Sequence, residues 1–215
     1  MGRGFKPHLP HPSRRAASWY PDIGSDARPH RRVHRTALAR RYRDAVPLFS
    51  RRRRLPAAER ARLDLRPGDA VLAATELADG QWVVATRRAL HVLGSDEVAR
   101  SPWCDVDGGT LDPATRTLSV RWVWGSTSQV VFPEEPGARA FSQAFRERVQ
   151  QSVVHVVTAA VPDGRRVRVA LRRDEDGELF TQVIPDGAVD LADPVVTAAV
   201  DAAEDEIRDA VGLPR

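Results

Sequence analysis

Apolar and polar residues alternate in short runs from residue 67 onward, a pattern that predicts an antiparallel sheet. The clearest run is Thr117–Trp124, in which four apolar residues occupy alternate positions and share one face of a strand. Turn residues separate the runs; in Ala78-Asp79-Gly80, glycine supplies the positive φ that a short hairpin loop requires. Among the tryptophans, Trp124 is expected to be the most exposed. We expect strands at 70–77, 81–86, 89–93, 103–111, 117–124 and 127–132, an edge strand within 94–102, and a bulge at Gly108-Gly109.

The period of the pattern changes to that of a helix after the last of these strands. Ala138–Gln151 carries Phe141, Phe145 and Val149 at four-residue intervals, with polar and charged residues on the opposite face. An aromatic stripe of this kind has to be buried, and the open end of a curved sheet is the available surface. Residues 67–152 therefore predict an α+β unit in which a helix caps a curved antiparallel sheet or barrel.

A smaller β-β-β-α unit is predicted over residues 153–212. Its strands are expected at 153–161, 165–173 and 178–184, and its C-terminal helix at 194–211. Asp193-Pro194 begins the helix, since a capping side chain is followed by proline at the first helical position. In the middle strand, alternation places Val167, Val169 and Leu171 on one face and Arg166, Arg168 and Arg172 on the other. Two roles fit this unit, namely packing on the first unit and mediating dimerisation.

Strands that curl and a helix that plugs one end describe a pleckstrin-homology-like (PH-like) barrel. The chain resembles one family in particular, the small, uncharacterised PH-like proteins of bacteria with GC-rich genomes. The residues that carry the resemblance are Gly68-Asp69-Ala70-Val71-Leu72-Ala73, Asp79-Gly80-Gln81-Trp82-Val83-Val84-Ala85-Thr86-Arg87-Arg88-Ala89-Leu90 and Pro102-Trp103-Cys104-Asp105-Val106-Asp107. The resemblance covers about residues 50–212. It implies a fold much more than an activity, because it supplies no functional residues.

The resemblance raises the question of phosphoinositide binding. Lipid-binding members of the wider fold usually carry several basic residues around the loop between the first two strands. In this chain that loop is Ala78-Asp79-Gly80, which is short and acidic. We therefore expect no specific inositol phosphate site there. Arg87 and Arg88, at the next turn, are expected to form a solvated rim.

The net charge of +4 conceals a strong asymmetry along the chain. Residues 1–66 contain 18 Lys and Arg against 5 Asp and Glu, whereas residues 67–215 contain 15 against 24. A basic arm on an acidic body is typical of a tether to nucleic acid or to an anionic surface. Such an arm can also fold back on the body. A third explanation is codon pressure in a GC-rich genome, because 32 of the 33 basic residues are arginine.

Residues 1–45 contain scattered prolines and arginines and little apolar periodicity, so we expect a disordered basic arm. The patterned sequence begins soon after Val46, which favours the further hypothesis that the natural chain starts there from a GUG codon. Residues 46–66 are expected to be a basic segment with a short helix at Pro56. This segment contains a run of four arginines that is a candidate anion-binding site. The alternative interpretation is that the run is simply a solvent-exposed segment that leads into the helix. The run is Arg51, Arg52, Arg53 and Arg54.

Residues with catalytic or metal-binding chemistry are few and scattered. His91 and His155 fall inside predicted strands. Nothing in the sequence places either histidine beside Cys104, which we expect to be a small buried thiol. Asp105 and Asp107 are expected on one strand face, but two carboxylates are too few for a typical divalent-metal site. We therefore expect no catalytic residue, no cofactor and no metal.

The chain contains one cysteine and therefore forms no intrachain disulfide. No window has the roughly 18 consecutive apolar residues of a membrane span. No apolar segment of a signal peptide follows the basic N-terminus. We therefore expect a cytoplasmic protein without a transmembrane segment.

These features favour a non-catalytic interaction or scaffold protein that binds a protein partner. The candidate partner surface consists of Arg166, Arg168 and Arg172. The acidic helix expected at 194–211 is complementary to these arginines, which favours a homo-oligomer. The alternative function is a nucleic-acid or anionic-membrane tether that acts through Arg51–Arg54.

Overall fold

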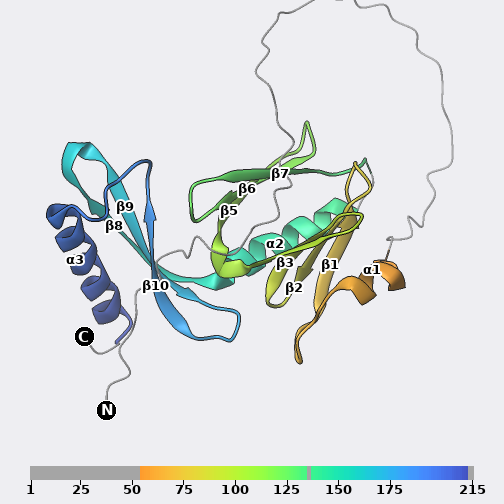
Figure 1. The fold of residues 1–215 in the computed structure, drawn as a ribbon, viewed down its shortest axis with the longest axis horizontal. Helices are drawn as coiled ribbons and strands as arrows, with labels where there is room; N and C mark the ends of the chain where they lie inside the picture. Colours follow the sequence, from red (N-terminus) through yellow and green to blue (C-terminus); the bar gives the residue numbers. More distant parts are fainter. Residues whose placement is uncertain (1–53, 135–136, 213–215) are drawn as a thin grey trace, which may run out of the picture.

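The structure is a computed structural model and describes residues 54–134 and 137–212. These residues form an α+β fold with three antiparallel sheets, shown in Figure 1. The first sheet has the order β1 (Val71–Glu76), β2 (Trp82–Thr86), β3 (Ala89–Leu93) and β4 (Val98–Pro102). The second has the order β5 (Val106–Asp112), β6 (Thr117–Trp122) and β7 (Thr127–Val131), and the third β10 (Leu179–Pro185), β9 (Arg166–Arg173) and β8 (Val153–Ala160). The helices are α1 (Ala57–Arg62), α2 (Gly137–Ser152) and α3 (Pro194–Ala210).

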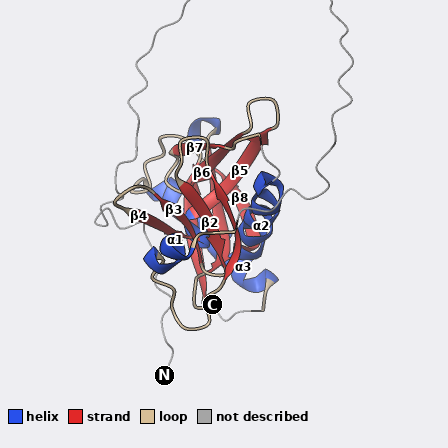
Figure 2. Cartoon of the chain, turned by 90° about the vertical axis from the view of Figure 1, so that its right-hand side faces the viewer, coloured by secondary structure: helices blue, strands red, loops and turns tan. Residues whose placement is uncertain are grey.

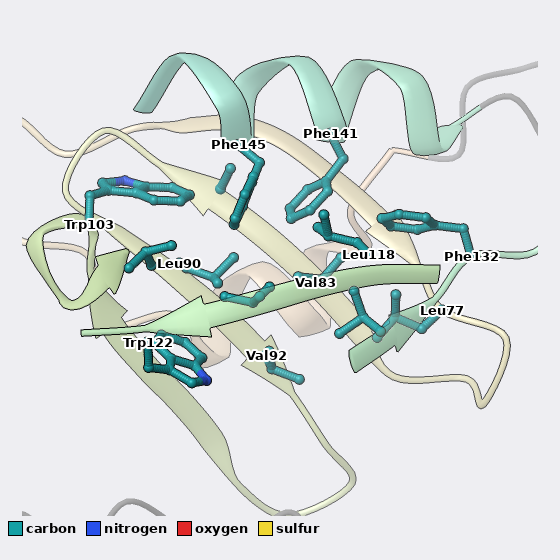
Figure 3. Packing of buried hydrophobic residues seen from close by; sticks show 14 residues of the cluster. Leu77, Val83, Leu90, Val92, Trp103, Leu118, Trp122, Phe132, Phe141 and Phe145 are labelled. Carbon is teal, nitrogen blue, oxygen red and sulfur yellow. The ribbon is translucent and has the colours of Figure 1, made fainter. Parts of the chain in front are cut away.

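Helix α2 buries its aromatic face against the first two sheets, as its four-residue spacing predicts. Phe141 is fully buried, and Phe145 packs edge-on against Trp103 with ring centroids 5.8 Å apart. Figure 3 shows both phenylalanine rings in a cluster with Val83, from the first sheet, and Leu118, from the second. One hydrophobic core therefore joins α2 to two sheets.

The predicted bulge lies in β5, where the register with β6 shifts between Val106 and Gly108. The next residue, Gly109, lies directly against α2. A Cβ atom at this position would lie 2.6 Å from Cε1 of Phe145. Glycine lets the strand pass this close to the helix, because two carbon atoms pack best at about 3.5–4.0 Å.

The first two sheets do not close into a barrel. The consecutive strands β4 and β5 belong to separate sheets. At the other side, the N–H of Ala78, just after β1, donates to the carbonyl of Val131 in β7 over 2.9 Å, but β1 and β7 form no ladder in the described chain. The predicted α+β class with antiparallel sheets and packed helices is therefore confirmed. The closed barrel is not seen, and the PH-like identity stays a prediction.

The strand expected over 103–111 begins later than predicted, because Trp103–Asp105 forms a 3₁₀ turn. Pro102 ends β4, since proline has no N–H to donate to a further ladder. The indole of Trp103 turns into the core, where its Nε1 donates to the Thr86 carbonyl over 3.0 Å. The carboxylates at 105 and 107 therefore do not share a strand.

Strand β6 ends at Trp122, two residues earlier than expected. Trp124 lies in the turn that follows and is 50% exposed, so its predicted exposure is confirmed. Its ring stacks on that of Trp122 with centroids 5.3 Å apart. The exposed indole is therefore supported by a buried one.

Helix α3 covers one face of the third sheet, as the apolar stripe of both elements predicts. The Asp193 carboxylate accepts a hydrogen bond from the Val195 N–H over 2.8 Å and caps the helix. The face of β9 that carries its arginines points the other way, toward the first two sheets. The residues buried between α3 and β9 include Val167, Val169, Leu171, Val196, Ala203 and Ile207.

The segment that contains α1 covers the outer face of the first sheet. Leu63 packs there with Trp82 and Leu93, while α2 packs on the inner face, so the sheet lies between the two helices (Figure 2). Arg62 ties the segment to the sheet, because its Nη2 donates to the Gly94 carbonyl over 2.6 Å. Helix α1 lies where the sequence predicts a short helix.

Candidate functional site

The arginine face of β9 lies mostly inside the protein. Arg172 is 1% exposed, and its Nη1 donates to the Val106 carbonyl over 2.9 Å and to Ser152 Oγ over 3.3 Å. Arg168 is half-buried and Arg166 is exposed. Two of the three arginines of the candidate partner surface are therefore engaged within the chain, against the first unit.

Asp107 of β5 is the counter-ion that holds these arginines. Arg168 donates two parallel hydrogen bonds to it, from Nη1 to Oδ1 over 2.7 Å and from Nη2 to Oδ2 over 2.8 Å. Arg121 Nε donates to Oδ2 over 2.6 Å, and Nη2 of Arg172 lies 3.7 Å from Oδ1. The Asp107 side chain is 2% exposed. This Asp107 cluster ties β5 to β9 across the seam between the two units.

The charges of the Asp107 cluster stabilise one another. Burial by itself raises the pKa of the Asp107 carboxyl, but hydrogen bonds from Arg168 and Arg121 outweigh it and lower this pKa below its usual value. The hydrogen bond to Asp107 in turn raises the pKa of Arg168. Burial lowers the pKa of Arg172, although a guanidinium remains charged at neutral pH. The cluster therefore acts as a structural tie.

Two of the cavities along the seam carry arginines. The larger, of about 380 Å³, is lined by Arg121 and Arg168, whose guanidinium groups are already held by Asp107. The smaller, of about 110 Å³, is lined by arginines from separate elements and is the candidate site; we name it the arginine cleft. Its arginines are Arg87, Arg88, Arg148 and Arg173.

The arginine cleft draws its walls from both units. Arg87 and Arg88 occupy the turn between β2 and β3, and Arg148 lies in the last turns of α2. Arg173 is the last residue of β9, in the second unit. The cleft therefore exists because the Asp107 cluster and α2 hold β9 beside the first sheet.

Two carboxylates also line the cleft, but each is engaged elsewhere. Glu175 forms ion pairs with Arg66, at 2.5 Å, and with Arg100. Asp174 Oδ1 accepts two hydrogen bonds of 2.9 Å from backbone N–H groups of its own turn. Neither carboxylate pairs with the arginines that line the cleft.

Three of the cleft arginines lack a counter-charge in the described part of the chain. Arg88 pairs with a carboxylate of the β9–β10 turn at 2.5 Å, but Arg87, Arg148 and Arg173 form no ion pair with a described residue. Arg148 Nη1 donates to the Arg87 carbonyl over 3.2 Å, and Arg173 Nη1 to the Gly177 carbonyl over 3.1 Å. Carbonyl groups orient these side chains without neutralising them.

Cys104 and His91 are poorly suited to nucleophilic or acid–base chemistry near neutral pH. Cys104 lines the cleft and is half-buried; burial, with a contribution from the Asp105 charge, raises the pKa of its thiol to about 12. His91 is fully buried in β3, where burial and the Arg100 charge lower its pKa to about 4. His155 lies half-buried on β8. Within residues 54–134 and 137–212, no group of three or more metal-ligating side chains occurs.

The sequence predicted only part of this site. Arg87 and Arg88 lie at the turn where a solvated rim is expected, whereas Arg148 and Arg173 carry no signal beyond polar positions near the end of a helix and of a strand. Packing alone brings them together. Residues 1–45 and most of the Arg51–Arg54 run lie outside the described residues; Arg54 is exposed.

No protein-family model, curated protein or solved structure matches this chain. The predicted PH-like identity therefore rests on the residue resemblance alone. In the described part of the chain, no helix combines the length and the apolar character needed to cross a membrane.

Proposed function

We propose that this protein is a non-catalytic binding module that takes an acidic side chain of a protein partner into the arginine cleft. The observation that carries this proposal is the gathering of Arg87, Arg148 and Arg173 around one concave surface, without a carboxylate partner among the described residues. Guanidinium groups bind carboxylates in a planar and often bidentate geometry. An acidic residue of a partner therefore supplies the missing counter-charge.

The size of the cleft favours a side chain over a free cofactor. Its volume is about 110 Å³, whereas sites for small molecules and cofactors usually enclose roughly 300–1,000 Å³. Arg87 and Arg173 are both exposed, so the cleft is accessible from solvent. A carboxylate that projects from the surface of a larger protein can enter such a site.

The arginine cleft binds its partner without a catalytic step. Cys104 is the nucleophilic side chain that lines the cleft, and its thiol stays protonated near neutral pH because its pKa is about 12. No described histidine lines the cleft to act as its base. The free cysteine also favours the cytoplasm as the compartment.

Binding of a fluorescently labelled hexaglutamate peptide to the full-length protein, followed by fluorescence anisotropy, tests the proposal. The double variant Arg87→Gln/Arg148→Gln is expected to weaken binding about tenfold or more. The reason is that a hydrogen bond to a charged group contributes roughly 1.5–3 kcal/mol, and about 1.4 kcal/mol corresponds to a factor of ten in affinity.

The double variant Arg139→Gln/Arg146→Gln is the matched control. It removes the same charge from two exposed arginines of α2 that do not line the cleft, and is expected to bind within about twofold of wild type. Equal weakening by both variants would indicate general attraction to a basic surface and would contradict the cleft. Retention on DNA or anionic vesicles that is lost when Arg51–Arg54 are replaced by alanine would favour the tether instead.

A further inference from the structure

The third sheet ends in an edge strand that has no second neighbour among the described residues. The order β10-β9-β8 leaves one side of β8 unpaired, and an open edge exposes a row of N–H and C=O groups to any strand that approaches. Strand β8 contains no Asp, Glu, Lys, Arg or Pro. The edge strands β4 and β10 carry residues that block such pairing, namely Arg100 and Pro102 in β4 and Pro185 at the end of β10, whereas β7 carries none.

Exposed valines lie on the face of β8 that is turned away from α3. The strand alternates between half-buried and exposed positions. Val154 and Val156 occupy exposed positions, at 41% and 42%. These side chains lie at the edge of the sheet, where a further strand would cover them.

The opposite face of this edge carries both apolar and acidic residues, because of the way α3 is rotated. Glu204 accepts a hydrogen bond from Thr181 Oγ1 of β10, so its side of the helix faces β10. Val195 precedes Glu204 by about two and a half helical turns and therefore projects from the opposite side, above β8. Val195 is 60% exposed, and Ala198, Ala202 and Glu206 are exposed on the same side.

We propose that β8 pairs antiparallel with β8 of a second copy of this chain, which joins the two third sheets into one. A two-fold axis perpendicular to the sheet makes the edge its own partner and places both α3 helices side by side on one face. On the other face, Val154 and Val156 of the two copies meet. Since Val153–Ala160 carries no Asp, Glu, Lys or Arg, no antiparallel register opposes such charges, which would destabilise the pair.

A second copy fits this edge better than a charged peptide does. Strand β8 itself offers no charge for such a peptide to complement, whereas a second copy brings matching valines to the face that carries Val154 and Val156. The surface is also separate from the arginine cleft, none of whose lining residues belongs to β8 or α3. Dimerisation and peptide binding can therefore be tested independently.

Light scattering coupled to size-exclusion chromatography of the full-length protein, at increasing concentration, tests the pairing. We expect the wild-type mass to approach twice the chain mass of 23.8 kDa. Val156→Lys is expected to return the mass to that of a single chain, because it places a charged side chain from each copy where the valines would pack along the new strand pair. Val131→Lys is the matched control and is expected to dimerise, since Val131 is also 42% exposed but lies in β7.

A wild-type protein that keeps the single-chain mass at every concentration would overturn the proposal. This outcome is also the one expected if another segment of the same chain covers β8. A dimer that survives both Val156→Lys and Val154→Lys would overturn it as well. Circular dichroism establishes which variants are folded. Val154→Lys, at a position that is 41% exposed, serves as the test if Val156→Lys does not fold.

Discussion

Replacing Asp107 with asparagine is expected to lower the free energy of unfolding by about 3–5 kcal/mol. The Asp107 and Arg172 side chains are each 2% exposed and lie 3.7 Å apart, so the variant leaves a guanidinium charge buried without its counter-charge. The asparagine side chain also accepts at one oxygen only, whereas Arg168 donates to both oxygens of the carboxylate. Urea denaturation followed by tryptophan fluorescence measures the loss.

Arg121→Gln is the control within the same cluster. Its Nε also donates to Asp107, over 2.6 Å, but its side chain is 55% exposed. Its removal leaves no charge buried alone, because Arg168 and Arg172 still face Asp107, so we expect a smaller loss of about 1 kcal/mol. Losses of similar size from Asp107→Asn and Arg121→Gln would contradict the view that burial makes the Asp107 cluster a strong tie.

Acidification is expected to destabilise the fold through His91 by about 3 kcal/mol between neutral pH and pH 4. Burial, and then the charge of Arg100, lower the folded-state pKa of His91 to about 4 from an ordinary value of 6.5. The unfolded chain therefore takes up the proton first as the pH falls. The stabilisation is complete above pH 6.5 and is lost progressively toward pH 4.

His91→Leu removes the titrating group from this buried position in β3. Urea denaturation measures the free energy of unfolding of this variant and of wild type at neutral pH and at pH 4. We expect the decrease between the two pH values to be about 3 kcal/mol smaller in the variant than in wild type. Asp107 acts in a separate range, because its pKa is lowered below 3.8 and its stabilisation is lost only under more acidic conditions. An unchanged pH dependence in His91→Leu would show that other groups cause the acid sensitivity.

Local periodicity predicted most of the secondary structure and its buried faces. The spacing of Phe141 and Phe145 predicts α2, and both rings are buried where the pattern places them. The alternation along β9 likewise predicts that Val169 and Leu171 lie on a buried face of the strand, and α3 covers this face. Patterns of this kind succeed because the side of an element that faces the core follows directly from its helical or strand geometry.

Periodicity could not predict how the two units pack against each other. Arg172 falls on the polar face of the alternating pattern, which is typical of a surface residue, yet it is 1% exposed. It is buried because it donates a hydrogen bond to the carbonyl of Val106, 66 residues earlier, and lies beside Asp107. A charge is buried only with a partner, and the sequence does not say which carboxylate lies opposite. The arginine cleft has the same origin, since Arg148 reaches the Arg87 carbonyl across 61 residues.

NMR of the isotope-labelled full-length protein, titrated with the hexaglutamate peptide, locates the bound peptide and tests the arginine cleft most directly. We expect the largest changes in backbone amide shifts around Arg87, Arg148 and Arg173, with little change along α3. Changes that centre on Arg166, or that are confined to residues 1–53, would contradict the claim that the cleft is the binding site.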